Sequence, residues 1–347
     1  MSTENRPGST SLAFILGAQR SGTTLLERLL SSHSEIKGGP EPHLLTPLAY
    51  LGYWGRVEKA PYDHVVASLG QKAFIDALPN KDQDYWNACR SYCDQLYDAY
   101  MDGGPESICL DKTPEYATVW PFLTKVFPDA KYIVLTRHPA AIFSSFANSF
   151  FDGDFKAAQQ HEAILERYIP ALAGFLRQDE VPFFHLCYED LVREPEKWMR
   201  KLYDFLELPF EANTVEYGAN HAHQASKSGL GDPIGVSQHS RPTDANIYKW
   251  AEEFSGNEEK RQLLDQTVKR LDANDLATIG YPLDTFWEPL ESSNLTTRKK
   301  HKRSRLTSYR LQRKLIVKGR SLAQRSKKVR ASLTWLRLAC DVMLREY

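Results

Sequence analysis

The chain has 347 residues, of which 42% are hydrophobic and 12% aromatic, enough for a large folded core in one or two domains. No run reaches the roughly 18 apolar residues that a membrane-spanning helix needs, and residues 1–10 lack the pattern of a secretory signal. We therefore expect a cytoplasmic protein.

The formal net charge is zero, but the charges are unevenly distributed. Residues 298–347 contain 17 of the 44 basic residues and two of the 44 acidic ones, which leaves 27 basic and 42 acidic residues in the rest of the chain. Such a split predicts an acidic body with a basic tail that has its own partner or folds back on the body.

The five cysteines are not regularly spaced. Cys89 and Cys93 lie one helical turn apart, but no second pair with metal-ligand spacing accompanies them. Buried thiols in a reducing compartment are the better interpretation.

The apolar pattern predicts strands that alternate with helices. A short apolar run at Leu12–Leu16 is followed by a glycine-bounded loop and a helical pattern from Thr23, while residues 53–105 are predicted to be largely helical. Further strands are expected at residues 108–110, 131–136 and 183–188. This order predicts an α/β fold, a P-loop-like parallel β-sheet flanked by helices on both faces. Ligands of such sheets bind beyond the carboxyl ends of the strands.

The segment Gly17–Thr24 follows a strand and opens a helix, as a phosphate-binding loop does. Thr23 stands where a P-loop has its lysine, which argues against an ATP-hydrolysing kinase or NTPase. Backbone N–H groups at a helix N-terminus still form an anion site, and Arg20 supplies a positive charge.

The run Arg20-Ser21-Gly22-Thr23-Thr24 after an apolar strand resembles the 5′-phosphosulfate loop of sulfotransferases that use 3′-phosphoadenosine-5′-phosphosulfate (PAPS). Among these enzymes, the motifs most resemble those of the tyrosylprotein and carbohydrate sulfotransferases and of the bacterial sulfotransferases. The resemblance extends over roughly residues 12–255 and implies that these five residues bind the 5′ end of PAPS.

The same resemblance implies a second anion site after the strand at residues 131–136. Arg137 and Ser145 would bind the 3′-phosphate, and Tyr188 would lie near the nucleotide. Ser237 lies where family members close the donor pocket with a loop.

Four residues are candidates for the chemistry. Glu41, between two prolines, resembles the catalytic base of tyrosylprotein sulfotransferases, and His43 competes for that role because imidazole has a reference pKa near ~6.5. Lys112 resembles the lysine that steadies the transferring group, and Arg20 would assist at the leaving 5′-phosphate. We expect no metal, since His221 and His223 have no third ligand at suitable spacing.

We therefore predict a catalytic domain at residues 1–290 and a basic amphipathic helical tail at residues 291–347. The predicted enzyme transfers a sulfuryl group from PAPS to the hydroxyl of a sugar, a lipid-linked group or a small molecule. Besides the kinase or NTPase, the alternative is a non-catalytic nucleotide-binding membrane adaptor. Residues 298–347 suit an anionic membrane surface, which would make the protein peripheral there, whereas no nucleic-acid-binding motif is present.

Overall fold

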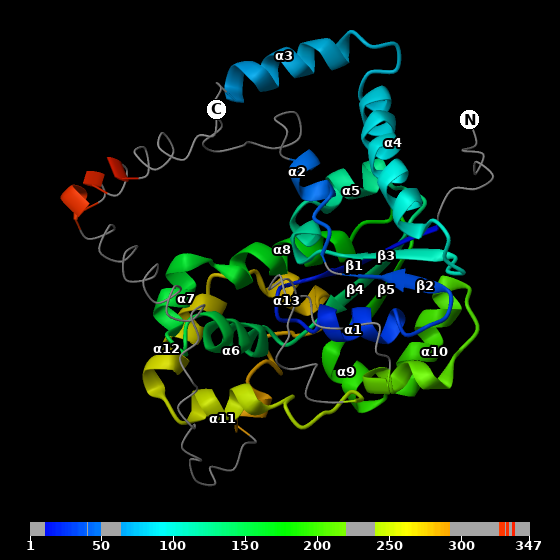
Figure 1. The fold of residues 1–347 in the computed structure, drawn as a ribbon. Coiled ribbons are helices and arrows are strands. Elements are labelled where there is room, and N and C mark those ends of the chain that lie inside the picture. Colours follow the sequence, from blue (N-terminus) through cyan, green and yellow to red (C-terminus); the bar gives the residue numbers. More distant parts are fainter. Residues whose placement is uncertain are drawn as a thin grey trace.

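A computed structural model describes residues 11–39, 41–49, 64–219 and 240–291, together with 326–329, 331–332 and 335–336. Its centre is a parallel sheet with the strand order β2-β3-β1-β4-β5 (Figure 1). The strands are β1 (Ser11–Gly17), β2 (Ile36–Gly38), β3 (Ile108–Lys112), β4 (Lys131–Thr136) and β5 (Phe183–Cys187). The predicted α/β architecture with a parallel sheet is confirmed.

Both faces of the sheet are buried, which explains why β1 and β4 are apolar without alternation. Leu12, Phe14 and Leu16 of β1 point into one hydrophobic cluster, and Ala13 and Ile15 point into the other. All five side chains are less than one tenth exposed. A strand that must fill two cores at once needs an apolar residue at every position.

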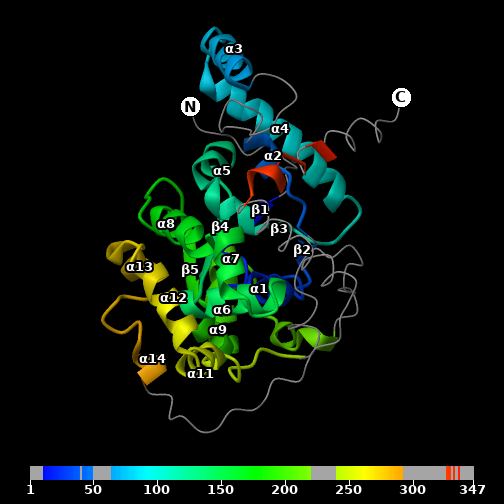
Figure 2. The ribbon, with the colours of Figure 1, turned by 90° about the vertical axis from the view of Figure 1, so that its left-hand side faces the viewer.

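Each face carries its own set of helices (Figure 2). The Ala13 face packs against α1 (Thr23–Leu30), α9 (Tyr188–Arg193) and α10 (Pro195–Leu206). The Phe14 face packs against α4 (Asp82–Met101), the 3-10 helix η1 (Pro114–Thr118), α5 (Trp120–Val126), α6 (Pro139–Phe150) and α8 (Ile164–Leu176). Helices on both faces were also predicted from the sequence.

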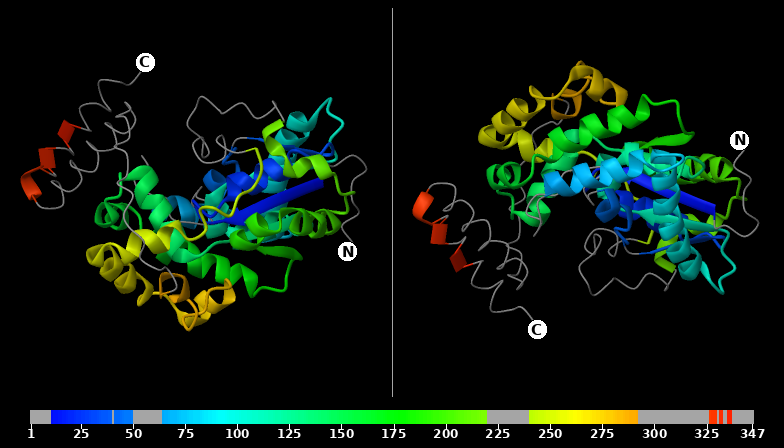
Figure 3. Two further views of the ribbon diagram at one scale, coloured as in Figure 1. Left: turned by 90° about the horizontal axis from the view of Figure 1, so that it is seen from below. Right: turned by 90° about the horizontal axis from the view of Figure 1, so that it is seen from above.

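The remaining helices lie around this core. Helices α11, α12 and α13 pack against α6, α7 and α8, respectively (Figure 3), while α3 and the adjoining part of α4 project away from the sheet (Figure 1). Their bounds are α2 (Leu45–Ala49), α3 (His64–Asp76), α7 (Phe155–His161), α11 (Lys249–Ser255), α12 (Glu258–Val268), α13 (Ala273–Thr278) and α14 (Glu288–Glu291), with 3-10 turns η2 (Ala212–Val215) and η3 (Tyr217–Ala219).

Two details of the strands differ from the sequence-based prediction. The structure has a fifth strand, β2, which is only three residues long and too short to show a pattern. Tyr188 begins α9 instead of ending β5, and Pro195 starts the separate helix α10, because its missing N–H suits a first helical turn. The predicted tail at residues 291–347 lies mostly outside the described residues. Within the described part of the chain, no helix is long and apolar enough to span a membrane.

Candidate active site

The phosphate-type loop connects β1 to α1 by a tight turn. Ser21 N–H donates to the Ala18 carbonyl at 3.1 Å, and both Arg20 (φ 70°) and Gly22 (φ 101°) adopt left-handed backbone conformations. Gly22 is the N-cap of α1, and no side chain caps this helix end. The first-turn N–H groups of α1 are therefore not used by a side-chain cap, as an anion site at a helix N-terminus requires.

Glycine is required at position 22 for two reasons. Its positive φ is strained for any L-residue with a side chain, and an added Cβ would lie 2.4 Å from the Tyr188 ring. Tyr188, the first residue of α9, therefore covers the loop from the end of β5, two strands away from β1 in the sheet. The tyrosine that the sequence suggested near the nucleotide does lie against the phosphate-type loop.

The two predicted anion sites meet at Arg20. Its Nε donates to Ser145 Oγ at 3.1 Å, and its carbonyl oxygen accepts from Arg137 Nη1 at 2.9 Å. The Arg137 guanidinium lies 4.2 Å from the centre of the Tyr188 ring, a cation–π contact. The structure thus brings together Arg20, Arg137, Ser145 and Tyr188, and it places Arg20 beside Ser145 on the side expected for the 3′-phosphate.

Two polar atoms of this region are enclosed without a hydrogen-bond partner. They are Arg137 Nε and Ser21 Oγ, and Ser21 is fully buried. A buried donor without a partner is costly, so each is suited to an anion that arrives from outside. One lies on the loop before α1 and the other at the end of β4, which fits a ligand with phosphates at two separated positions.

Lys112, the last residue of β3, holds the other side of the site. Its Nζ lies 2.5 Å from Glu41 Oε1 and 3.5 Å from Thr24 Oγ1, and its side chain is only 3% exposed. Glu41 is 14% exposed. A lysine buried this deeply needs a counter-charge, and Glu41 supplies it. The predicted base, the predicted lysine and the phosphate-type loop are therefore in direct contact.

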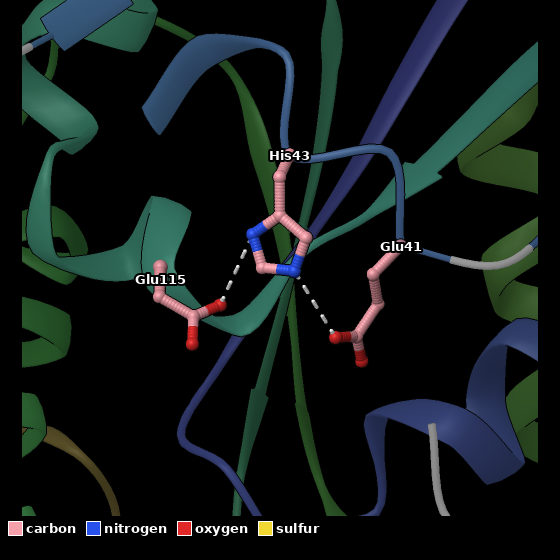
Figure 4. Close-up of side chains that lie close together, drawn as sticks. All are labelled: Glu41, His43 and Glu115. Atoms are coloured by element: carbon pink, nitrogen blue, oxygen red, sulfur yellow. Dashed lines mark ion pairs between the residues drawn. The ribbon is translucent and has the colours of Figure 1, made fainter. Parts of the chain in front are cut away.

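His43 lies between two carboxylates (Figure 4). Its Nε2 is 3.6 Å from Glu41 Oε2, and its Nδ1 is 3.9 Å from Glu115 Oε2. Glu115 comes from η1, and its Oε1 accepts from Gln19 Nε2 of the loop after β1 at 2.9 Å. The sequence analysis identified Glu41 and His43 but missed Glu115 and Gln19.

This cluster has the composition of a metal site. Glu41, His43 and Glu115 each offer a ligand atom within 4.8 Å of the others. The two carboxylates, however, face opposite nitrogens of the imidazole, whereas an ion would have to bind one nitrogen. Glu41 is also already paired with Lys112. We therefore assign no ion to these residues; His221 and His223 lie outside the described residues.

A buried carboxylate next to Lys112 fixes the loop that carries Glu41. Asp111 accepts from the hydroxyl groups of Tyr97 at 2.6 Å, Tyr116 at 3.0 Å and Thr113 at 3.1 Å. Burial raises the pKa of Asp111 to about 6, although these hydrogen bonds act in the opposite direction. The Tyr116 hydroxyl also accepts from the backbone N–H of Leu45 at 3.2 Å. Asp111 thereby links the end of β3 to the segment that follows His43.

A second buried network fixes the residue after Arg137. The backbone N–H of His138 donates to Glu189 Oε1 at 3.1 Å, and Glu189 Oε2 accepts from Tyr281 at 2.5 Å. The His138 ring stacks on Trp250 and hydrogen-bonds the Phe286 carbonyl at 3.0 Å. Burial lowers the pKa of His138 to about 4, so the ring is a neutral structural group. These contacts anchor the turn that presents Arg137.

Eleven of the twelve predicted residues lie at the carboxyl ends of the strands or in the loops and helices that follow them. They are Arg20, Ser21, Gly22, Thr23, Thr24, Glu41, His43, Lys112, Arg137, Ser145 and Tyr188 when the catalytic and binding sets are taken together. Ser237 lies outside the described residues, so its predicted role in closing the pocket stays a prediction.

The fold and the site agree with the similarity of the chain to known proteins. A family model described as "Sulfotransferase family" matches residues 13–212, more than half of the 347 residues. The chain therefore belongs to the sulfotransferase family, as the loop motif predicted. The matched range includes every predicted site residue except Ser237.

Individual relatives match the chain either over a short segment or at low sequence identity. The nodulation protein NoeE of Sinorhizobium fredii is 36% identical over 140 residues, which are 40% of this chain and 32% of that protein. Protein-tyrosine sulfotransferase 1 of Danio rerio is 26% identical over 240 residues, 68% of this chain and 62% of the relative. The chain thus spans less than two thirds of the length of these relatives. A solved sulfotransferase domain, from the Synechococcus PCC 7002 olefin synthase, is 25% identical, with a TM-score of 0.46 over 72% of this chain and 90% of that one.

Proposed function

We propose that the protein transfers a sulfuryl group from PAPS to a hydroxyl group of an acceptor. The contact that carries this proposal is that of Lys112 with both Glu41 and Thr24, because it joins a base candidate to a phosphate-type loop through one buried cation. Family membership supports the same reaction.

The donor site in this proposal uses both anion positions. Ser21, Gly22, Thr23 and Thr24 hold the 5′ end through backbone N–H and hydroxyl groups at the start of α1. Arg137 and Ser145 hold the 3′-phosphate, and Arg20 lies between the two because it contacts Ser145. The enclosed, unpartnered atoms Arg137 Nε and Ser21 Oγ support this assignment.

The residues of the chain then divide the chemistry among them. Glu41 takes the proton of the acceptor hydroxyl while the acceptor oxygen forms its bond to sulfur and the bond from sulfur to the 5′-phosphate oxygen breaks. Lys112 leaves its ion pair with Glu41 and stabilises the negative charge of the transferring sulfuryl group. Arg20 neutralises the charge on the leaving 5′-phosphate. The in-line arrangement comes from fixing both partners at neighbouring strand ends.

The proposal also covers the class of acceptor, the domain boundaries and the attachment of the protein to membranes. Protein-tyrosine sulfotransferases are among the relatives, so tyrosyl hydroxyls come first, and the sugar and lipid-linked hydroxyls expected from the sequence come next. We propose residues 1–290 as the catalytic domain and residues 291–347 as a basic tail that attaches a cytoplasmic protein to anionic membrane surfaces.

A labelled-sulfuryl assay tests the function. We would incubate ³⁵S-PAPS with tyrosine peptides, oligosaccharides and glycolipids, and compare wild type with Glu41→Gln. Glu180→Gln is a matched control, since it changes an exposed ion pair with Lys125. Transfer by wild type and the control, with at least about a hundredfold loss in Glu41→Gln, supports the proposal. Tight PAPS binding without transfer in any arm would favour the non-catalytic adaptor.

A further inference from the structure

Glu115 has an unusual position relative to His43. Its Oε1 is held by Gln19, whereas its Oε2 faces His43 Nδ1 at 3.9 Å and is enclosed without a hydrogen-bond partner. A carboxylate oxygen in this state needs a donor or a positive charge nearby. His43 Nδ1 faces this oxygen (Figure 4) and can supply the donor when it carries the hydrogen.

A proton on Nδ1 has a consequence for the opposite nitrogen. In a neutral imidazole only one nitrogen carries hydrogen, so Nε2 then has a free lone pair. Nε2 faces Glu41 Oε2 at 3.6 Å. Glu41 Oε1 is occupied by Lys112, which leaves Oε2 as the oxygen through which Glu41 can exchange a proton with His43.

The difference in exposure between Glu41 and His43 gives the proton transfer a direction, from the more buried side chain to the more exposed one. Glu41 is 14% exposed, whereas His43 is 36% exposed and can exchange protons with water. His43 also has a left-handed backbone conformation, φ 53°, which is uncommon for a residue with a side chain. Residues with such backbone conformations cluster at functional sites, and the ring of His43 lies between the two carboxylates.

We infer that Glu115 is a positioning residue that holds His43 in the Nδ1–H tautomer, so that His43 Nε2 removes from Glu41 the proton taken from the acceptor. This inference rests on the function proposed above. The acceptor oxygen loses its proton to Glu41 Oε2, His43 Nε2 takes it and becomes imidazolium, and Glu41 returns to a carboxylate. The imidazolium then releases a proton to solvent. The distances of 3.6 and 3.9 Å would shorten or be bridged by water in the substrate complex, as catalytic contacts often do.

Glu41 and His43 both have the chemistry of a base, but they lie at different places relative to Lys112. Glu41 contacts Lys112 and the phosphate-type loop through that lysine, so it is next to the reacting group. His43 faces the other carboxylate oxygen of Glu41, so in this scheme it receives the proton through Glu41. A model in which His43 takes the acceptor proton directly makes a different prediction, because Glu41 would then be dispensable.

The tautomer can be measured without knowing the acceptor. Nitrogen-15 NMR of the full-length protein at alkaline pH reports which ring nitrogen carries hydrogen, and the spectrum of His43→Gln identifies the His43 signals. We expect the Nδ1–H form in wild type and in Glu180→Gln, and the Nε2–H form, which free histidine favours, in Glu115→Leu. An Nε2–H form in wild type, or an unchanged tautomer in Glu115→Leu, would overturn the inference.

Kinetics separate a proton relay from a structural role. The acceptor probes are 4-nitrophenol, which ionises readily, and a tyrosine peptide, which does not. We expect kcat of Glu115→Leu and of His43→Gln to fall about tenfold or more with the peptide and to change little with 4-nitrophenol. The double variant should be no slower than His43→Gln. Equal losses with both probes, or losses that multiply, would contradict the relay, while absence of PAPS binding in wild type would instead reject the proposed function.

Discussion

The Lys112 ammonium and the Glu41 carboxylate form a buried ion pair, 2.5 Å between Nζ and Oε1, at the carboxyl end of β3. The residue that would stabilise the transferred group and the residue that would act as base thus neutralise each other before substrate binds. Desolvation makes each charge costly alone. The pair therefore has a structural role in addition to its proposed catalytic role, and the two roles can be separated.

Removing one partner of this pair should destabilise the protein, whereas removing both should not. We expect Lys112→Met to lower the free energy of unfolding by about 3–5 kcal/mol, because Glu41 is left partly buried without its counter-charge. The double variant Glu41→Gln/Lys112→Met should recover most of this loss and remain inactive. Urea unfolding of the three proteins checks this. A double variant as unstable as Lys112→Met would show that the charge pairing is not the cause.

Gly22 should be far less tolerant of alanine than another glycine with positive φ. Gly103 (φ 75°) has nothing within 4 Å of an added Cβ, so Gly103→Ala carries backbone strain alone, about 1–2 kcal/mol. Gly22→Ala adds the contact with Tyr188 and should also weaken nucleotide binding. Thermal unfolding and calorimetry with 3′-phosphoadenosine-5′-phosphate measure both effects. Equal behaviour of the two variants would mean that Tyr188 does not cover the loop as described.

His138 makes the protein sensitive to acid. Its pKa is lowered to about 4 by burial, whereas an unfolded histidine has 6.5. The unfolded chain therefore binds this proton first, and the stabilisation from His138, on the order of 3 kcal/mol, is present above pH 6.5 and lost as pH falls toward 4. Relative to wild type, His138→Gln should gain stability as pH falls through this window. Urea unfolding across the pH range measures the difference, and parallel curves would contradict it.

Asp111 should act with the opposite sign. Burial raises its pKa from 3.8 to about 6, so the folded protein binds this proton more tightly than the unfolded chain does. The associated stability is present below pH 3.8 and lost as pH rises through about 6, again on the order of 3 kcal/mol. Asp111→Asn lacks this loss and should gain stability relative to wild type as pH rises. If the difference between the two proteins stays constant with pH, Asp111 is ionised in a better-solvated site than the structure indicates.

The sequence predicted the parts of the site that follow from local patterns. Residues such as Arg20 and Arg137 come directly after apolar runs, and the carboxyl ends of parallel strands share one edge of a sheet. The pattern of apolar strands was therefore sufficient to predict that these residues lie at the same edge of the sheet. It did not predict that Arg20 contacts Ser145, because these residues are 125 positions apart and their contact depends on how β1 and α6 are placed.

The residues that the sequence did not reveal are those that support others. Glu115 and Glu189 contact residues far away in the sequence, and nothing in their local spacing distinguishes them from surface acids. Asp111 has partners nearer in the sequence, at Tyr97, Thr113 and Tyr116, but no known motif connects them. The local signal for Asp111 was that it directly follows the apolar run at residues 108–110, where a buried charge would require partners. Strand β2 was missed because three residues carry no periodicity.

The central claim is that the two strand-end anion positions bind the two ends of one bisphosphorylated nucleotide. Calorimetry with 3′-phosphoadenosine-5′-phosphate tests it most directly, with AMP, ADP and Mg²⁺-ATP for comparison, on wild type and Arg137→Ala. We predict tight binding of the bisphosphate without metal, weak binding of AMP, and a loss of at least about tenfold in affinity in Arg137→Ala, as expected when a hydrogen-bonded charge contact is removed. A preference for Mg²⁺-ATP, or equal binding of the bisphosphate by wild type and Arg137→Ala, would contradict the claim.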